Sequence, residues 1–326
     1  MANHLNASGH AKSYFKHDPI DINGRHDSIR LVKVLPDLSR EGFIQCQLRA
    51  HSFPPASWDS CHTTEDFDDE PWDPTDYSAD PNDWDIDVPV YKCLSYTWGP
   101  PQEDCIIKIN GRVLLIRRNL WEFLCVAQDQ YSGQAFWIDA LCIGQTNTVE
   151  RNHQVKQMGR IYSRAQMVYV WLGNKHKLSS LLHYLSIKKE EQNQWLQHAL
   201  EKLFETFAMD EFWTRAWVTQ EIVLARRVFV LAGSSRHELR SLARIIQNQT
   251  FSYLGHNGFE HFADILADKK ELKNWSLINL LRHFRDKKCA IKRDRVYSLL
   301  ALCGEGRELD VDYSISDREL LVYILR

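Results

Sequence analysis

The run Ala135-Phe-Trp-Ile-Asp-Ala-Leu-Cys-Ile143 is almost wholly apolar and lies between Gly133 and Gly144. A continuous apolar run bounded by glycines is typical of a strand that is buried on both faces of a parallel sheet. Two further runs, YKCLSY (91–96) and MVYVWLG (167–173), are also predicted to be strands. Segments with apolar residues at helical spacing separate the strands. This alternation predicts an α/β fold with a mainly parallel sheet and flanking helices.

Two hairpins are predicted from shorter apolar runs. IRLVKV (29–34) and FIQCQL (43–48) flank a polar linker, which favours a first hairpin. In the run IIKINGRVLLI (106–116), Asn110-Gly111 separates two apolar halves. This dipeptide is a strong signal for a two-residue turn, so a second hairpin is expected there.

Polar residues mark the starts of two predicted helices. Asn119 is expected to cap the first, and Asn147, with Glu150 three residues later, resembles a capping box at the start of the second. Apolar spacing predicts further helices over 178–189, 193–208 and 215–227, and a final strand at 227–233.

The chain divides into three predicted regions. Residues 1–26 are polar and are expected to be flexible, 27–235 form the α/β domain, and 236–326 form a helical extension. The α/β domain carries an acidic insertion at about 54–88, which contains no Lys or Arg. This insertion is either a solvated loop or a partner-binding element anchored by its tryptophans, Trp58, Trp72 and Trp84.

Composition argues against several classes of function. The net charge of −3 and the lack of a long basic run exclude nucleic acid as an expected partner. No apolar run approaches a membrane span and the N-terminus has no apolar signal segment, so a soluble cytoplasmic protein is expected. Eight cysteines without CxxC spacing indicate a reducing compartment. Cys61-His62, His256 and His261 lack further ligands at zinc spacing, so no metal site is expected.

One acidic residue stands out in the segment RAWVTQEIVLARR (215–227). Wound as a helix, this segment places Glu221 on its apolar arc. A carboxylate there must be ion-paired, neutralised or exposed to a cavity, because burying an isolated charge is very costly. One explanation is a structural ion pair with Arg151, Arg160 or Arg215. The other is a functional carboxylate at the wall of a cavity.

Three blocks of the sequence resemble the heterokaryon incompatibility (HET) domain of fungi. They are YKCLSYTWG (91–99), the segment from FWIDALCIGQ to VWLG (136–173) and RAWVTQEIVLA (215–225). The resemblance covers about residues 29–318, and it departs from the family at Gly144, where asparagine is usual. It implies an effector of fungal non-self recognition that triggers growth arrest or cell death when incompatible cells fuse.

The order and spacing of the blocks also resemble Toll/interleukin-receptor (TIR) domains, which implies a TIR-like, flavodoxin-like architecture. In TIR domains that cleave NAD, a tryptophan is often followed four residues later by the catalytic glutamate. Here Trp217 precedes Glu221 by four residues. The resemblance therefore implies NAD glycohydrolysis with Glu221 as the catalytic carboxylate, and self-association on activation.

The other site residues are expected where open α/β sheets bind ligands, outside the carboxyl ends of the strands. They would shape a crevice for NAD or a related nucleotide as substrate, with no bound cofactor: Ser95, Tyr96, Thr97, Trp98, Gly99, Asp139 and Trp217. One carboxylate is enough for this chemistry. Nicotinamide leaves NAD as a neutral molecule, so no general acid has to protonate it.

A non-enzymatic interpretation assigns the same residues to structure. The tryptophans would belong to the core, Asp139 would bond the backbone amides of a turn, and the domain would signal by self-assembly and protein partners. The surroundings of Glu221 distinguish the two interpretations. A carboxylate facing a cavity with Ser95 or Trp98 favours the enzyme, whereas one clamped by arginine without a cavity favours the signalling module.

Overall fold

The computed structural model describes residues 13–22, 27–53, 90–101, 104–187, 197–248 and 275–325, together with Phe259, Phe262, Ala263, Ile265 and Leu266. The predicted acidic insertion at 54–88 with its tryptophans, and the Cys61-His62, His256 and His261 positions, lie outside the described residues.

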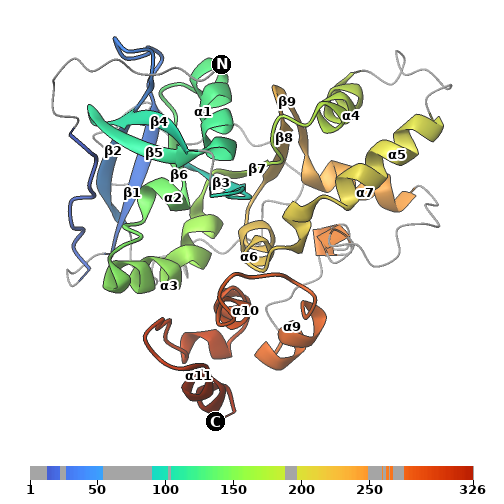
Figure 1. Ribbon diagram of the computed structural model, residues 1–326. Coiled ribbons are helices and arrows are strands. Elements are labelled where there is room, and N and C mark those ends of the chain that lie inside the picture. The colour runs from blue at the N-terminus through green and yellow to red at the C-terminus, as the bar shows by residue number, and fades with distance from the viewer. Residues whose placement is uncertain are drawn as a thin grey trace.

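The described strands form one sheet in the order β5-β4-β2-β1-β6-β3-β7-β8-β9. The first five are β1 (Asp27–Val34), β2 (Ile44–Phe53), β3 (Lys92–Tyr96), β4 (Asp104–Ile109) and β5 (Arg112–Arg117). The others are β6 (Ala135–Trp137), β7 (Met167–Trp171), β8 (Val228–Ala232) and β9 (Ser235–Glu238). Figure 1 shows the sheet running through the molecule from β2 to β9.

The centre of the sheet is parallel. Strands β6, β3, β7 and β8 pair in parallel, and antiparallel strands border them on both sides. Numbered along the chain, these four strands have the order 2-1-3-4, which is the order of flavodoxin-like sheets. The predicted α/β class is therefore confirmed. The chain passes from β3 to β6 on one side and then to β7 on the other, so the order reverses beside β3.

Helices cover both faces of the sheet and continue beyond it. In chain order they are α1 (Arg118–Gln130), α2 (Asp139–Cys142), α3 (Thr148–Arg164), α4 (His176–Ser186), α5 (Gln197–Ala208), α6 (Val218–Val223), α7 (Leu239–Asn248), α9 (Leu277–His283), α10 (Asp294–Tyr297) and α11 (Asp317–Ile324). Short 3-10 turns add η6 (Glu211–Thr214), η8 (Leu300–Leu302) and η9 (Glu305–Arg307).

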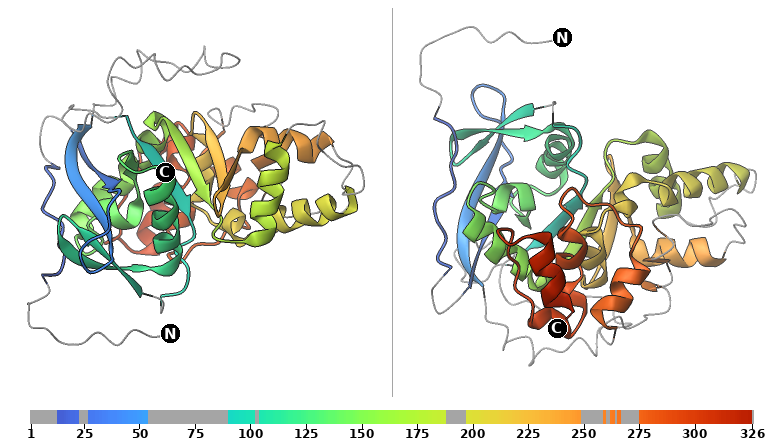
Figure 2. Two further views of the ribbon diagram at one scale, coloured as in Figure 1. Left: turned by 90° about the horizontal axis from the view of Figure 1, so that it is seen from above. Right: turned by 60° about the horizontal axis from the view of Figure 1, so that its bottom comes forward.

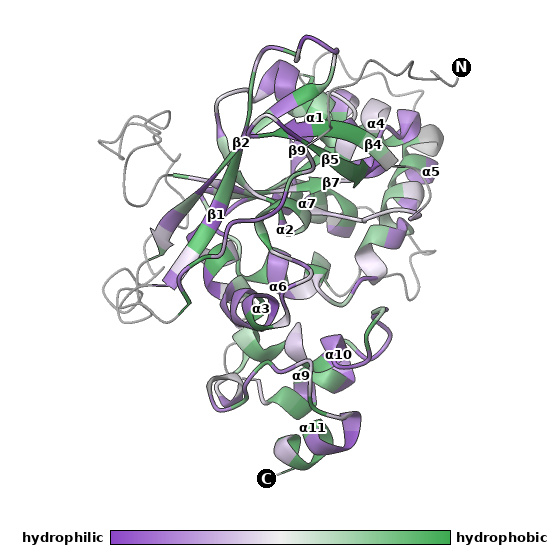
Figure 3. Ribbon diagram, turned by 60° about the vertical axis from the view of Figure 1, so that its left-hand side comes forward, coloured by the Kyte–Doolittle hydropathy of each residue, from purple (hydrophilic) through white to green (hydrophobic). Residues whose placement is uncertain are grey.

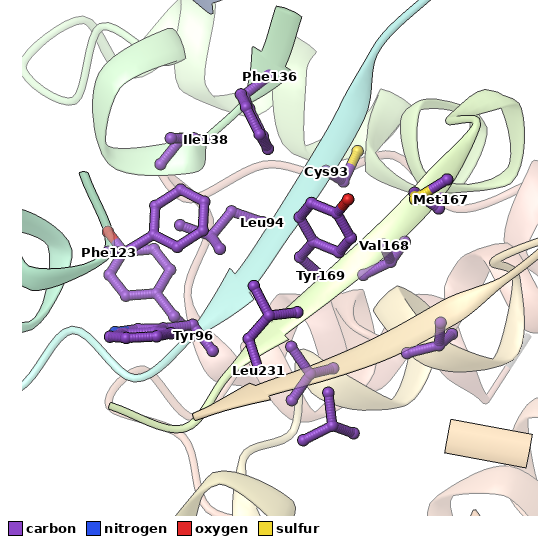
Figure 4. Packing of buried hydrophobic residues seen from close by; sticks show 14 of the residues in the cluster. Cys93, Leu94, Tyr96, Phe123, Phe136, Ile138, Met167, Val168, Tyr169 and Leu231 are labelled. Carbon is purple, nitrogen blue, oxygen red and sulfur yellow. The ribbon is translucent and has the colours of Figure 1, made fainter. Parts of the chain in front are cut away.

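Adjacent residues of β6 show how the two faces are packed. Successive side chains of a strand point to opposite faces. Phe136 meets Phe123 of α1 with ring centroids 5.7 Å apart, and Trp137 meets Tyr162 of α3 at 5.6 Å. Figure 4 shows part of this core around β3, β7 and β8. Helices α1 and α3 therefore lie on opposite faces, which explains why the central strands are apolar throughout.

The C-terminal helices form a second hydrophobic cluster. It joins Leu280 of α9, Val296 of α10 and Leu320 of α11, and Val223 and Leu224 at the end of α6 pack against it. Figures 1 and 2 show α9, α10 and α11 gathered next to α3 and α6. Helix α7 belongs to the larger cluster of the sheet instead. Figure 3 shows green, apolar residues along β2 and β7, with purple, polar residues on α3.

The N-terminal segment that we expected to be flexible makes defined contacts over residues 13–22. The amide of Phe15 donates to the carbonyl of Val113 at 2.8 Å, and that of Val113 to the carbonyl of Ser13 at 3.0 Å. His17 Nε2 lies 2.7 Å from the carbonyl oxygen of Leu141. This part of the chain therefore runs beside β5 and α2.

Two predicted elements end earlier than expected. The strand predicted over 135–143 stops at Trp137, and α2 begins at Asp139, whose Oδ1 accepts the amide of Ala140 at 2.7 Å. A short acidic side chain that bonds a nearby amide favours such a turn. The helix predicted over 215–227 is only Val218–Val223, because the backbone of Arg215 pairs with that of Lys288 and so is not helical.

The structure contradicts two further predictions, on the last strand and on the cap of α1, and confirms the two hairpins and the cap of α3. Strand β8 is not the final strand, since β9 follows it in a hairpin. Asn119 does not cap α1, which begins at Arg118. Both predicted hairpins form, and the turn between β4 and β5 has positive φ at Asn110 (49°) and Gly111 (78°). Asn147 caps α3 by accepting the amide of Glu150 at 3.2 Å.

Candidate functional site

The candidate site is built around a contact between β3 and α6. The hydroxyl of Ser95 donates a hydrogen bond to Oε2 of Glu221. Ser95 is 1% exposed and Glu221 is 3% exposed. Ser95 precedes the last residue of β3, where the strand order of the parallel sheet reverses. Open α/β sheets bind their ligands outside such strand ends, and Glu221 therefore lies next to the carboxyl end of β3.

The surroundings of Glu221 favour its protonated form. Burial raises the pKa of its carboxyl to about 7, while the Arg215 guanidinium and the Ser95 hydrogen bond act in the opposite direction. The negative charge of Asp139 adds to the rise. A carboxyl with a pKa near neutrality, in a buried site with a second acid, is the arrangement expected of a functional group.

No arginine clamps Glu221 among the residues that the structure describes. Arg215 donates to the carbonyl of Tyr96 instead. Arg160 is paired with Asp27, with Nη1 to Oδ2 at 2.6 Å. The guanidinium of Arg151 lies 4.6 Å from the centre of the Tyr313 ring. Within the described ranges, the structural ion pair that would explain Glu221 without a function is absent.

Asp139 is a second acid at the same edge of the sheet. Its Oδ2 accepts the indole N–H of Trp98 at 2.9 Å, and its Oδ1 accepts the amide of Ala140. Burial raises the pKa of Asp139, against the charge of Arg215 and the hydrogen bonds from Trp98, Ala140 and Tyr96. The structure thus brings Ser95, Tyr96, Trp98, Asp139 and Glu221 together.

The loop that follows β3 is held by α1. The side-chain amide of Asn119 donates to the carbonyl of Thr97 at 2.6 Å, and Arg117 donates to the carbonyl of Gly99 at 2.8 Å. Asn119 Oδ1 also accepts the indole N–H of Trp171 at 2.9 Å, so one side chain links the ends of β3 and β7. Gly99 has a φ of 73°, a left-handed conformation that glycine adopts without strain.

Trp217 does not join the group around Glu221. It is partly buried between the two hydrophobic clusters, and its side chain acts to lower the pKa of Asp294 of α10. Sequence reasoning also missed the roles of Arg215 and Asn119 at this site. The sequence pattern predicts Asn119 as a helix cap, whereas it lies in the first turn of α1 and its side chain donates to the loop after β3.

Glu221 is enclosed in this structure. A cavity of about 430 Å³ is lined by Gln45, Gln47 and Asn110, among others, and another of about 480 Å³ lies between α3 and residues 310–314. Neither includes Ser95 or Glu221. Glu221 itself is only 3% exposed, so its carboxyl is buried in this structure.

No helix in the described part of the chain is long and apolar enough to cross a membrane. No group of three or more His, Cys, Asp or Glu side chains within these residues is placed to hold a metal ion.

Replacing Glu221 by glutamine is expected to stabilise the protein above pH 7. Because the folded pKa of about 7 exceeds the ordinary value of 4.5, the folded state binds the carboxyl proton more tightly than the unfolded state does. Ionisation of Glu221 therefore lowers the free energy of unfolding. This loss approaches about 3 kcal/mol at high pH and vanishes below about pH 4.5. Urea unfolding of both proteins from pH 5 to 8 measures this difference. A constant difference across that range would contradict the raised pKa.

Comparison with known proteins gives one family match. Residues 91–221 match the family model described as "Heterokaryon incompatibility protein (HET)", and the match ends at Glu221. The chain is 25% identical over 238 residues to vegetative incompatibility protein HET-E-1 of Podospora anserina, covering 68% of this chain and 15% of that protein. It is 24% identical over 311 residues to heterokaryon incompatibility protein 6, OR allele, of Neurospora crassa, covering 70% and 45%. The chain thus spans less than half the length of either relative. No solved structure matches it.

Proposed function

We propose that this protein, whose residues 91–221 match the family model of heterokaryon incompatibility (HET) proteins, is an effector of fungal heterokaryon incompatibility that hydrolyses the nicotinamide–ribose bond of NAD. The contact between Ser95 and Glu221 carries the proposal. It places a buried carboxyl of raised pKa at the strand end where flavodoxin-like sheets bind nucleotides. Cell death would follow from the loss of NAD.

The proposed reaction needs one ionised carboxylate. The bond between C1′ of the ribose and the pyridinium nitrogen breaks, and its electron pair passes to that nitrogen, so nicotinamide leaves neutral. Glu221 stabilises the positive charge that develops on the ribose, and a dry site strengthens this interaction. Water then attacks C1′ and releases a proton, which gives ADP-ribose.

The neighbouring residues would have supporting roles. Ser95 orients the Glu221 carboxylate through its hydroxyl. Tyr96, Trp98 and Asp139 would form the wall against which the ribose and the nicotinamide ring lie. Because Glu221 is only 3% exposed, access for NAD requires the Thr97–Gly99 loop or α6 to shift, and we propose that self-association of the protein drives this opening.

Nicotinamide release from NAD tests the proposal directly. Purified protein is incubated with NAD over a range of protein concentrations, because an assembly-dependent enzyme gains specific activity as it associates. Turnover that rises more steeply than in proportion to protein concentration is the expected result. No release of nicotinamide at any concentration or degree of assembly would refute the enzymatic function.

The pH dependence of the reaction follows from the pKa of Glu221. Since kcat/KM reports ionisation in the free enzyme, it should rise about tenfold per pH unit below a pKa of about 7 and level off above it. Initial rates at low NAD concentration from pH 5 to 8.5 give this profile. A flat profile would show that ionised Glu221 is not the reactive form.

A second function is favoured by the enclosure of Glu221. A carboxyl that is 3% exposed and away from both described cavities also suits a non-enzymatic module that signals by self-assembly and protein partners. Such a module would trigger the incompatibility response without consuming NAD. A Glu221→Gln variant that still triggers cell death in the fungus would favour this function.

A further inference from the structure

The chain just before α6 is paired with a segment outside the HET match. The backbone of Arg215 forms a parallel β-bridge with that of Lys288. The amide of Ala216 donates to the carbonyl of Lys288 at 2.9 Å, and the amide of Lys288 donates to the carbonyl of Thr214 at 2.6 Å. Arg215 in turn donates to the carbonyl of Tyr96 at the end of β3. One bridge thus connects the C-terminal region to the edge of the candidate site.

A buried lysine strengthens this pairing. Lys287 is 3% exposed, and its Nζ donates to the carbonyl of Trp213 at 2.5 Å while lying 4.1 Å from the centre of the Phe262 ring. Burial lowers the pKa of Lys287 to about 7. A long, charged side chain is costly to bury, so its place under the segment before α6 indicates a specific structural requirement.

A second contact holds the first residue before α6. The indole of Trp217 interacts with Asp294 and acts to lower its pKa, and Asp294 accepts a hydrogen bond from the hydroxyl of Tyr313 at 2.6 Å. Trp217 directly precedes the helix that carries Glu221, and the amide of Glu221 donates to the carbonyl of Trp217 at 3.3 Å. The position of Glu221 is therefore connected to Asp294 through a single residue.

The far end of α6 is also held by the C-terminal region. Leu224 packs against the second hydrophobic cluster. A Cβ added at Gly159 of α3 would lie 2.2 Å from the Cβ of Ala301 and 3.3 Å from Leu224. The glycine thus allows the C-terminal region, α3 and α6 to meet closely. Figure 1 shows α10 directly beside α6.

We infer that Lys287 and Asp294 are positioning residues for the candidate site: they hold the segment 213–217 so that Glu221 stays against Ser95 in a dry environment. The HET domain at 91–221 would then depend on the region that follows it for a competent site. The catalytic consequence rests on the proposed function, whereas the effect on the environment of Glu221 does not.

Loosening the segment 213–217 would change the environment that sets the pKa of Glu221. The ionisable groups that face it are Asp139 of α2, Arg215, Tyr162 of α3 and Cys93 of β3, with the Ser95 hydroxyl as its hydrogen-bond donor. Desolvation is the largest cause of its raised pKa. If α6 shifts and water reaches the carboxyl, its pKa should fall toward the ordinary value.

Three variants test the inference. Lys287→Met removes the ammonium but keeps an apolar stem, and Trp217→Phe keeps an aromatic ring but removes the indole N–H. Lys292→Met is the matched control, because Lys292 is exposed in the same region. The pKa of Glu221 is followed by the ¹³C resonance of its carboxyl in protein made with labelled glutamate, and is assigned by comparison with Glu221→Gln. The values of kcat and KM for NAD are measured in parallel.

We expect Lys287→Met and Trp217→Phe to lower the pKa of Glu221 by about one unit, with Lys292→Met unchanged. Turnover should fall about tenfold in kcat in both variants, while KM changes less than twofold. An unchanged pKa in both variants would overturn the inference, even if they are less stable. If Lys287→Met does not fold, the pKa of Glu221 in Trp217→Phe decides the test. If the wild-type protein releases no nicotinamide, the proposed function fails, and the resonance still decides the positioning role.

Discussion

Nicotinamide release is expected to fall by about 10²- to 10³-fold in Glu221→Gln, the loss seen when one preorganised group that stabilises transition-state charge is removed. Glutamine keeps the size of the side chain and can still accept the Ser95 hydrogen bond, so the fold should be preserved. It carries no negative charge and cannot stabilise the positive charge that develops on the ribose. The rate is measured at saturating NAD and at the protein concentration of highest wild-type activity.

Glu211→Gln is the matched control for this experiment. Glu211 is exposed and lies in η6, ten residues before Glu221, so the same change of charge should leave turnover within twofold. If Glu221→Gln is more stable than the wild type above pH 7 but loses turnover, the buried carboxyl of Glu221 lowers stability and is needed for activity. Equal turnover in Glu221→Gln and the wild type would remove Glu221 from the mechanism.

Breaking the buried ion pair between β1 and α3 is expected to cost about 3–5 kcal/mol of stability. Arg30 and Glu150 are each 3% exposed and meet in two bonds, Nη1 to Oε1 at 2.5 Å and Nη2 to Oε2 at 3.1 Å. Arg30 also donates to the carbonyl of Cys142 at 2.9 Å. Arg30→Met leaves the carboxylate of Glu150 buried without its partner, and denaturant unfolding at pH 7 measures the loss.

The exposed pair Arg118 and Glu122 supplies the control. Its side chains are 58% and 20% exposed, so Glu122→Gln should cost less than about 0.5 kcal/mol. Burial acts to raise the pKa of Glu150, but the Arg30 and Gly144 hydrogen bonds outweigh it and the pKa is lowered. The stabilisation by Glu150 is therefore present above the ordinary pKa and is lost as the pH falls through the folded value. A loss below 1 kcal/mol in Arg30→Met would contradict this role.

The same ion pair explains why glycine occupies position 144. The amide of Gly144 donates to Oε1 of Glu150 at 2.6 Å, and a Cβ at this position would lie 2.9 Å from both carboxylate oxygens. A side chain at position 144 would have to displace the carboxylate that Arg30 binds. The close approach of Glu150 thus gives a structural reason for glycine at position 144.

The sequence alone determined the local features of this protein. Apolar runs identified β3 and β7, Asn110-Gly111 identified the turn between β4 and β5, and the alternation of strands and helices identified the class of fold. These features follow from residues close together in the chain, whose propensities and burial pattern act locally. The oddly placed Glu221 was visible in the same way, as a charge on an apolar arc.

Only the tertiary structure decided what surrounds that charge. Ser95 and Glu221 are 126 residues apart in the chain, and the side chain of Arg215 donates to the carbonyl of Tyr96 instead of forming an ion pair with Glu221. Trp217 is expected at the site because of its spacing from Glu221, yet its side chain packs between the two hydrophobic clusters near Asp294. Such contacts depend on which strand edges and helix faces meet, and the spacing of residues along one segment does not contain that information.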